Sequence, residues 1–524
     1  MGVEALLGSL SRSFPIDAGN IEVLESPTEF LQCLCNGIKH AKRDVTLCAL
    51  YCGMGEAEEE TLWDCIQESK VNIRILFDAQ RALRPVERNG PSSVDSILKR
   101  LFHSDDKSGE EGRIEMHLFH SPLLRGIIHR ALPVRIREIV GVQHMKMYVF
   151  DDSVLLSGAN LSETYFTNRQ DRYILFKNAP ELANFVLNVF NEIIKSSYQV
   201  IVPALEGGKA LSAVSPQELV PQYGMKATTG FVLKRPVYDP VLQPYIFCSD
   251  LRARLERIIL PKETDEHLYK VAFPHKYRIG HVGFGVDDMR ECMSGDMSKV
   301  SDTLIFPTFQ AGFARVRQDE VLTLGFLRYL AHYARQVDGP MAGELWIATP
   351  YMNFSASYEH AFHQIPHNIK MTILTSSMES NGFYQSKGIS SNIPHAYSYL
   401  EKKLWRKMQK SSQYSNYIQN SRILREFHHE NSEFHAKGMY WKPFDRQEPM
   451  VLTVGSSNYG RRSLNRDLEL QAFIVTRNEG LKSSFEKEWN HLISKSRVVE
   501  WEDLMRRKGP YLSRLAGRFL RSFL

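Results

Sequence analysis

The chain has 524 residues, of which 43% are hydrophobic and 24% are charged. This is the composition of a globular protein, and it excludes a disordered, collagen-like or coiled-coil chain. The net charge is only +5, which gives no reason to expect a nucleic acid as partner. No segment approaches the roughly 18 consecutive apolar residues of a membrane-spanning helix. We therefore expect a soluble or peripheral protein with two to four domains, or two large ones.

The cysteines and the N-terminus bear on the cellular compartment. Seven cysteines, an odd number, include no CxxC pair, which fits a reduced compartment better than a disulfide framework or a zinc ribbon. Residues 1–14 have no apolar core of the kind found in a secretory signal. They are also poor in arginine for a mitochondrial presequence.

Along the chain, one pattern of strands and helices occurs twice. In both halves a last predicted strand is followed by a stretch with apolar residues at helical spacing, at 181–197 and 481–495. Strands that alternate with amphipathic helices predict an α/β architecture with helices packed on the sheet faces. The corresponding predicted strands are 44–53 and 344–354, 72–81 and 369–380, and 168–177 and 465–475.

The repeat also predicts the domain organisation. Residues 202–235 are rich in Gly, Pro, Ser and Ala, which is typical of a connecting segment. We expect a first domain at 1–205, a linker at 206–235, a second domain at 236–500 and a separate tail at 501–524.

The two halves share a chemical motif. In the first half, His144 and Lys146 are two residues apart, so on a strand both side chains point to the same face. After a short turn, a second predicted strand brings Ser157 and Asn160 back beside the histidine. The two residue types therefore lie together at one end of a hairpin.

The second half repeats this motif with a longer turn. His435 and Lys437 are again two apart, and the returning strand carries Ser456 and Asn458. The histidine and the asparagine are 16 residues apart in the first half and 23 in the second. A single HxK sequence is usually accidental, whereas a pair in two halves of a duplicated chain indicates one shared site.

This set of side chains suits phosphoryl transfer. A neutral imidazole can attack phosphorus and carry the group covalently, while a second imidazole protonates the leaving oxygen and deprotonates the incoming alcohol. Lysines and asparagine amides stabilise the charge on the non-bridging oxygens. Asp171 and Glu469 each follow the motif asparagine by 11 residues, where a carboxylate can hold the other imidazole nitrogen and set the tautomer.

The motifs resemble the paired HxKxxxxD sequences of the phospholipase D superfamily. Residues 143–173 are similar to the eukaryotic, mitochondrial CDP-diacylglycerol–glycerol-3-phosphate 3-phosphatidyltransferases of that superfamily, and so are 309–320, 380–384, 433–441 and 455–471. The resemblance implies two α/β/α sandwich domains, related by a pseudo-twofold axis, that share one active site. It implies catalytic roles for the two His/Lys pairs, both asparagines, both carboxylates and Asp151.

The second motif departs from the superfamily pattern. Lys442 stands where an aspartate is expected, and Asp445 follows three residues later. The two halves are therefore unequal, which favours His144 as the nucleophile.

The resemblance also implies the reaction. A phosphatidyl group would pass from CDP-diacylglycerol to His144 and then to glycerol 3-phosphate, with His435 as acid and base. No metal and no cofactor are expected. The residues expected to bind the substrates are Ser157, Ser456, Arg81, Arg169, Arg172, Arg461 and Arg466, although a surface or ion-pair role is as plausible for each arginine.

Several alternatives stay open. The acceptor could be serine or water, which would make the protein a phosphatidylserine synthase, a phospholipase or a nuclease, or the chain could be a non-catalytic member that binds anionic lipid. Residues 512–523 place apolar side chains at spacings of 3 and 4 with arginines between them. This pattern predicts a basic amphipathic helix for an anionic membrane surface. The resemblance implies the mitochondrial inner membrane, and the oligomeric state is left unpredicted.

Overall fold

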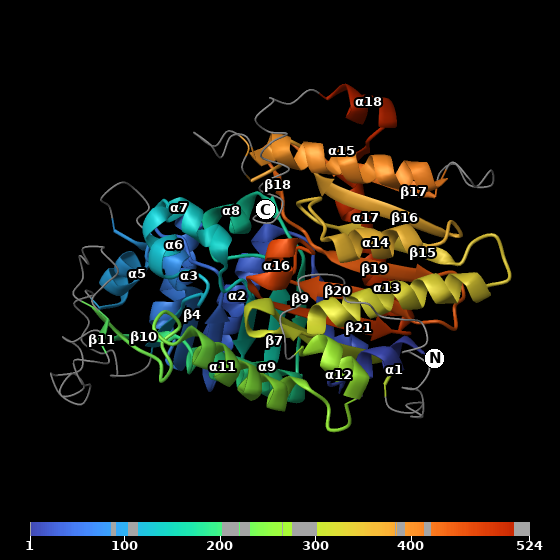
Figure 1. Cartoon of the computed structure of the whole chain (residues 1–524). Helices are drawn as coiled ribbons and strands as arrows, with labels where there is room; N and C mark the ends of the chain where they lie inside the picture. The colour runs from blue at the N-terminus through green and yellow to red at the C-terminus, as the bar shows by residue number, and fades with distance from the viewer. Residues whose placement is uncertain are drawn as a thin grey trace.

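The computed structural model describes residues 2–84, 91–102, 114–201, 219–220, 231–264, 266–274, 301–382, 384, 393–412 and 421–507. Two halves lie side by side, one coloured blue to green and the other yellow to red (Figure 1). Each half is built around a mixed β-sheet of ten strands. The α/β class predicted from the sequence is confirmed.

In the first sheet, three central parallel strands are continued on both sides by antiparallel ones. In spatial order its strands are β2 (Ile21–Leu24), β9 (Tyr173–Phe176), β7 (Ser153–Ser157), β6 (Met147–Phe150), β3 (Asp44–Cys48), β4 (Asn72–Asp78), β5 (Ile114–Phe119), β10 (Tyr198–Ile201), β12 (Val232–Lys234) and β11 (Leu219–Val220). Strands β11 and β12 come from the segment predicted to be a linker.

The second sheet repeats this order. Its strands are β1 (Phe14–Pro15), β13 (Thr303–Ala311), β21 (Leu468–Thr476), β20 (Met450–Gly455), β19 (Gly438–Pro443), β15 (Gly343–Ala348), β16 (Ile369–Ser376), β17 (Arg422–Phe427) and β22 (Ser496–Val498), with β14 (Val316–Arg317) paired to β13. Again the three parallel strands, β15, β16 and β17, stand in the middle. The duplication predicted from sequence is therefore a duplication of sheet topology.

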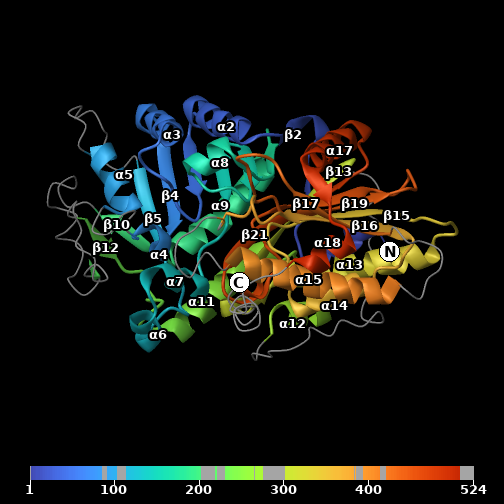
Figure 2. The ribbon, with the colours of Figure 1, turned by 90° about the horizontal axis from the view of Figure 1, so that it is seen from above.

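Helices cover both faces of each sheet. In the first half α2 (Pro27–His40) and α3 (Ala57–Glu68) pack on one face, and α9 (Pro180–Ile194) packs on the other. In the second half α17 (Glu479–Ser494) lies opposite α13 (Gln318–Gln336), α14 (Ala356–Gln364) and α15 (Ile393–Ser412) (Figure 2). The remaining helices are α1 (Val3–Gly8), α4 (Ala79–Ala82), α5 (Ser93–Phe102), α6 (Gly126–Ala131), α7 (Val134–Arg137), α8 (Glu163–Thr167), α11 (Pro244–Ile259), α12 (Glu266–Ala272), α16 (Arg461–Asn465) and α18 (Trp501–Arg506).

Local sequence explains why these helices form where they do. Ser26 accepts a hydrogen bond from the Glu29 amide at 3.2 Å, and the Glu29 carboxylate accepts one from the Glu25 amide at 3.0 Å. This arrangement closes the start of α2, and Pro27 occupies the first turn, where its missing N–H costs nothing. In α9 the buried residues recur at spacings of three and four, so one apolar face meets the sheet.

The N-terminal segment crosses from one half to the other, which the sequence analysis did not anticipate. Strand β1 pairs with β13 of the second sheet, and the hydroxyl of Ser11 donates to the carbonyl of Pro307 at 2.7 Å. The two halves are thus joined at the N-terminus as well as through the connecting segment. The boundaries at 205, 236 and 500 remain a prediction.

Within the described residues, no helix is both long and apolar enough to cross a bilayer. The basic amphipathic helix predicted at 512–523 lies outside the described residues.

Candidate active site

His144 and Lys146 lie directly before β6, although the sequence placed them on the strand itself. There the chain leaves its own sheet and pairs with the other half: Gln143 forms a parallel bridge with Leu468, and the His144 amide donates to the Leu468 carbonyl at 2.9 Å. The backbone at the first histidine is therefore held by the second half of the molecule.

The second half makes the same exchange in reverse. Strand β18 (Glu433–Phe434) pairs in parallel with β8 (Arg169–Gln170), and the His435 amide donates to the Gln170 carbonyl at 2.8 Å. The two motifs thus meet across the boundary between the halves. This reciprocal pairing is the pseudo-twofold relation expected of one shared site.

The carboxylates predicted to orient the histidines do so crosswise. Nδ1 of His144 lies 2.9 Å from Oε2 of Glu469, which belongs to the second half. Nδ1 of His435 lies 2.6 Å from Oδ2 of Asp171, which belongs to the first half. Each Nδ1 is thereby occupied, so Nε2 is the ring nitrogen left for chemistry on each histidine.

Both lysines lie at the histidines and are buried. Lys146 Nζ donates to the His144 carbonyl at 2.7 Å, and Lys437 Nζ donates to the His435 carbonyl at 2.7 Å and to Asp171 at 3.2 Å. Burial lowers the pKa of Lys146 to about 7 and also lowers the pKa of Lys437. A bound phosphate would raise both values again, because an anion favours the charged amine.

The same burial keeps both imidazoles neutral. It lowers the pKa of His144 well below the usual range, assisted by the charge of Lys146, and it lowers the pKa of His435 likewise, assisted by Lys437. A neutral ring has the lone pair that nucleophilic attack requires.

The two carboxylates differ in charge state. Burial raises the pKa of Glu469 to about 7, even though the hydroxyls of Ser456 and Ser463 each donate to it at 2.5 Å. Burial also acts on Asp171, but the charge of Lys437 and the hydrogen bond with His435 outweigh it and lower its pKa. Only Asp171 is therefore fully ionised at neutral pH.

The reactive nitrogens differ as well. The hydroxyl of Tyr165 lies 3.3 Å from Nε2 of His435 and accepts a hydrogen bond from the Asn160 amide at 3.1 Å. Nε2 of His144 has no hydrogen-bond partner among the residues that the structure describes. Tyr165 is a site residue that the sequence analysis missed, since nothing in its local pattern marks it.

The turn residues of the motifs are also brought to the site. The hydroxyl of Ser157 donates to the Arg172 carbonyl at 2.7 Å, so it braces the backbone beside Asp171. Oδ1 of Asn458 is buried and has no hydrogen-bond partner within the described residues. A Cβ at position 158 would overlap Lys437 Nζ and the Asp171 carboxylate, which explains the glycine there by the close approach of the halves.

Asp151, predicted to be catalytic, lies at the far end of its hairpin from His144 and Lys146. It occupies the turn at the far end of β6, with a φ of 49°. Its carboxylate accepts hydrogen bonds from the amides of residues 42, 43 and 44 at 2.8, 2.9 and 3.1 Å. Its function is to tie the hairpin to the start of β3, which also explains why Lys442 can replace the aspartate in the other half.

Replacing Asp151 by Ala is therefore expected to lower stability and to leave turnover intact. Three backbone donors lose an acceptor, at a cost of about 1–3 kcal/mol, and Ala is strained at positive φ. Urea unfolding and kcat of the folded fraction measure the two effects. A loss of kcat in fully folded protein would return Asp151 to the catalytic set.

Arg172, predicted to bind substrate, is buried in an ion pair between the two halves. Its side chain is 1% exposed, and it binds both carboxylate oxygens of Glu488 at 2.8 and 3.1 Å. It also donates to the Lys437 carbonyl at 3.3 Å and lies over the Tyr440 ring. Arg172 thus joins the first half to the second, directly beside Asp171.

The single substitution Arg172→Met should lower the free energy of unfolding by about 3–5 kcal/mol, because it leaves Glu488 buried and uncompensated. The double variant Arg172→Met/Glu488→Gln is the matched control, since it removes both charges and keeps an acceptor for the Tyr440 hydroxyl, which donates at 2.8 Å. The control should unfold at clearly higher urea concentration than the single variant. Equal urea midpoints for the single and the double variant would show that the uncompensated charge of Glu488 does not lower stability.

The other arginines predicted to bind substrate have different surroundings. Arg169 binds Glu433 at 2.5 Å and lies 4.5 Å from the centre of the Tyr165 ring, at the edge of the site. Arg81 lies 4.0 Å from the centre of the Tyr51 ring. Arg461 is exposed, and Arg466 donates to the carbonyl of Ile139 at 3.3 Å.

Arg462 is nearer to the chemistry than its neighbour Arg461, which the sequence analysis had selected. Its charge contributes to the low pKa of His144, and its guanidinium binds Asp467 at 3.1 Å. Adjacent positions on a short helix point in different directions, so the sequence alone did not distinguish the two arginines.

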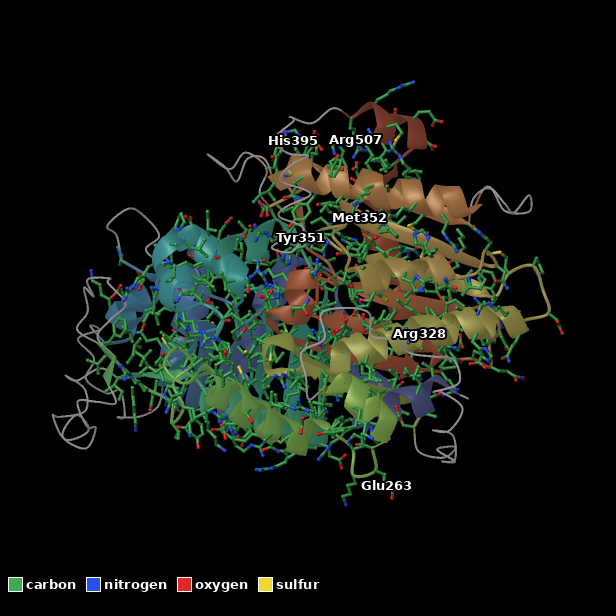
Figure 3. All side chains as sticks on the ribbon, in the orientation of Figure 1. Glu263, Arg328, Tyr351, Met352, His395 and Arg507 are labelled. Atoms are coloured by element: carbon green, nitrogen blue, oxygen red, sulfur yellow. The ribbon has the colours of Figure 1, made fainter. Side chains whose placement is uncertain are left out.

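An aromatic pair stands beside the site in the second half. Tyr351 lies near the middle of the molecule, where the halves meet (Figure 3), and stacks on Tyr397 of α15 with ring centres 4.6 Å apart. The charges of Arg169 and Asp171 both act on the pKa of Tyr351, although burial is the main cause of its rise to about 12. Among the described residues, no group of three or more His, Cys, Asp or Glu side chains is arranged to hold a metal ion.

A duplicated α/β sandwich with one His/Lys pair from each half defines a phospholipase-D-like protein. In agreement, the family model described as "Cardiolipin synthase, PLD-like domain" matches residues 342–493. The structure also resembles the phosphatidylserine synthase of Haemophilus influenzae, with a TM-score of 0.66, 19% identity and coverage of 100% of this chain and 99% of that one. At this identity the likeness shows the fold alone.

Proteins related in sequence identify the family to which this phospholipase-D-like chain belongs. The probable CDP-diacylglycerol–glycerol-3-phosphate 3-phosphatidyltransferase of Dictyostelium discoideum is 30% identical, over 96% of this chain and 77% of that protein. The mitochondrial enzyme of the same name from Homo sapiens is 29% identical, over 94% of this chain and 80% of its own length. The chain therefore belongs to the family of CDP-diacylglycerol–glycerol-3-phosphate 3-phosphatidyltransferases.

Proposed function

We propose that this protein transfers the phosphatidyl group of CDP-diacylglycerol to glycerol 3-phosphate, giving phosphatidylglycerophosphate and CMP. The observation that carries the proposal is the crossed pair of neutral imidazoles, each with Nδ1 held by a carboxylate of the other half. The likeness to the Dictyostelium and human enzymes over nearly the whole chain supports this choice of substrates.

In the first step, Nε2 of His144 attacks the phosphorus that carries diacylglycerol. The bond from this phosphorus to the bridging oxygen breaks, and CMP leaves with the bond's electron pair. His144 is the better nucleophile because its Nε2 is free of hydrogen bonds within the described residues. Lys146, Lys437 and Asn458 are placed to donate to the non-bridging oxygens.

In the second step, the primary hydroxyl of glycerol 3-phosphate attacks the phosphatidyl-histidine. Its proton passes to Nε2 of His435, the bond between phosphorus and His144 breaks, and the product leaves. The ionised Asp171 stabilises the imidazolium formed on His435. This division of roles follows from the unequal charge of the two carboxylates.

The acceptor's phosphate needs a cation near the site. Arg169, which lies over the Tyr165 ring beside His435, is the arginine among those predicted that best fits this role. Serine as acceptor, as in a phosphatidylserine synthase, remains the second candidate, because the Haemophilus enzyme shares the fold.

The lipid substrate calls for contact with a membrane surface. The human relative's mitochondrial name favours placement on the mitochondrial inner membrane.

The test is release of CMP from CDP-diacylglycerol with glycerol 3-phosphate, serine or water as the acceptor. We expect release and phosphatidylglycerophosphate formation with glycerol 3-phosphate alone. Serine-dependent release would make the protein a phosphatidylserine synthase, and no release with any acceptor would favour a non-catalytic lipid-binding protein.

A further inference from the structure

An apolar surface is exposed on the first half, on α6 and at the start of α11. Ile127 and Ile128 are 84% and 49% exposed, and Tyr245 and Ile246 are 81% and 50% exposed. The guanidinium of Arg125, which directly precedes α6, lies 5.4 Å from the centre of the Tyr245 ring, so the starts of the two helices are neighbours, along the lower left edge of the molecule in Figure 2. We call these four apolar residues the α6–α11 patch.

The patch stands out from the rest of the described surface. Val134, Val237 and Leu242, which are also exposed, flank it in the sequence. Away from these two segments, the large apolar side chains exposed in the described residues are single ones, such as Phe444 and Val498. Soluble proteins rarely leave a contiguous apolar patch in water unless it meets a partner.

The α6 side of the patch is basic, whereas residues 237–250 around the start of α11 contain Asp239 and Asp250 and no Lys or Arg. Residues 121–137 contain four arginines and no Asp or Glu. Exposed isoleucines and an aromatic ring among arginines fit the headgroup region of an anionic bilayer, which accepts apolar side chains and attracts the basic ones. A second copy of this chain fits poorly, because a twofold contact would set arginines against arginines.

The patch is linked to the active site along the chain. After α7, the short helix Glu138–Val140 leads within four residues to His144. It is fixed there by Arg466, which donates to the Ile139 carbonyl, and the next segment is fixed by Asp467, which accepts from the Val142 amide at 3.0 Å. The chain therefore passes from the patch to His144 along a segment that the second half fixes.

We propose that the α6–α11 patch docks on an anionic bilayer and so brings lipid phosphates to the active site. The proposal rests on the proposed function for the identity of the lipid substrate. It concerns a different part of the chain from the predicted tail helix at 512–523. The apolar side chains enter the headgroup region, and Arg125 and Arg130 contact lipid phosphates.

The test is co-sedimentation of the full chain with vesicles of phosphatidylcholine and phosphatidylglycerol in equal amounts. The variant Ile127→Ser/Tyr245→Ser should bind these vesicles at least about tenfold more weakly than the wild type. The matched control is Phe444→Ser/Val498→Ser, which alters side chains that are 49% and 47% exposed elsewhere. It should bind like the wild type.

Measurements of turnover distinguish a defect in membrane docking from a defect in catalysis. The patch variant should lose turnover of CDP-diacylglycerol held in vesicles and keep turnover of a short-chain, water-soluble analogue. Wild-type binding by the patch variant would overturn the proposal. A change in its sedimentation velocity with unchanged vesicle binding would also overturn it and would identify a second copy as the occupant. Failure of the proposed function would appear differently, as no CMP release by the wild type from either substrate, with vesicle binding still dependent on the patch.

Discussion

Replacing His144 by Ala should lower kcat for phosphatidyl transfer by at least about 10⁴-fold, because the covalent carrier of the group is lost. The side chain is 10% exposed and its amide stays bound to the second half, so we expect the fold to survive. Rapid quenching after mixing with CDP-diacylglycerol, followed by mass spectrometry, measures the phosphatidyl adduct as well as the rate. The variant should form none.

His435→Ala should fail at a different step. The leaving group in the first step is a phosphate, whose second pKa is about 6, so CMP departs with little help from an acid. The attack of the alcohol in the second step needs the base. We therefore expect this variant to release about one equivalent of CMP and to accumulate an adduct on His144.

His40→Ala, which alters an exposed histidine at the end of α2, is the control and should keep full activity. An adduct on His435 in the wild-type protein would reverse the two roles. Full turnover by His144→Ala would remove the histidine mechanism altogether.

Asp171→Asn is expected to lower kcat by about 10³–10⁴-fold. The amide is neutral, so it neither stabilises the imidazolium on His435 nor balances Lys437, which lies 3.2 Å from the carboxylate. Steady-state kcat and KM for glycerol 3-phosphate test this, and we expect the loss in kcat with KM little changed.

Glu469→Gln provides the comparison, because the two carboxylates occupy corresponding positions. The pKa of Glu469 is raised by burial to about 7, so at neutral pH the substitution removes only part of a charge. We expect a loss of about tenfold to a hundredfold in kcat.

The wild type should also lose activity as the pH falls through about 7. A protonated Glu469 donates to Nδ1 of His144 and leaves the proton on Nε2, where it blocks attack. In the Glu469→Gln variant this loss of activity at low pH should be absent. Equal losses in the two carboxylate variants would contradict the unequal roles assigned to the histidines.

Much of this protein could be predicted from short-range patterns. Strands such as β4 and β16 are buried apolar runs, and helices such as α9 show their apolar residues at helical spacing, so the α/β class and the duplication follow from local sequence. The His/Lys pairs could be recognised because the two residues of each pair are adjacent on one face of an extended chain. Repetition in both halves then indicated one shared site.

The roles of other residues depended on partners far along the chain. Asp171 and Glu469 were predicted to orient histidines, but their crosswise partners are 264 and 325 residues away. Arg172 carries the same charge as the arginines at the rim, and only its burial against Glu488 distinguishes it from them. Asp151 belongs to the superfamily motif, yet it binds backbone amides at the opposite end of the hairpin.

The sequence by itself determined the fold class, the duplication and the two His/Lys pairs proposed to react, because periodicity and close spacing are properties of neighbouring residues. The tertiary structure alone decided which carboxylate serves which histidine, which arginines can reach a substrate and where the N-terminal strand pairs. These features depend on burial and on contacts between the two halves, and such contacts leave no periodic trace in either segment.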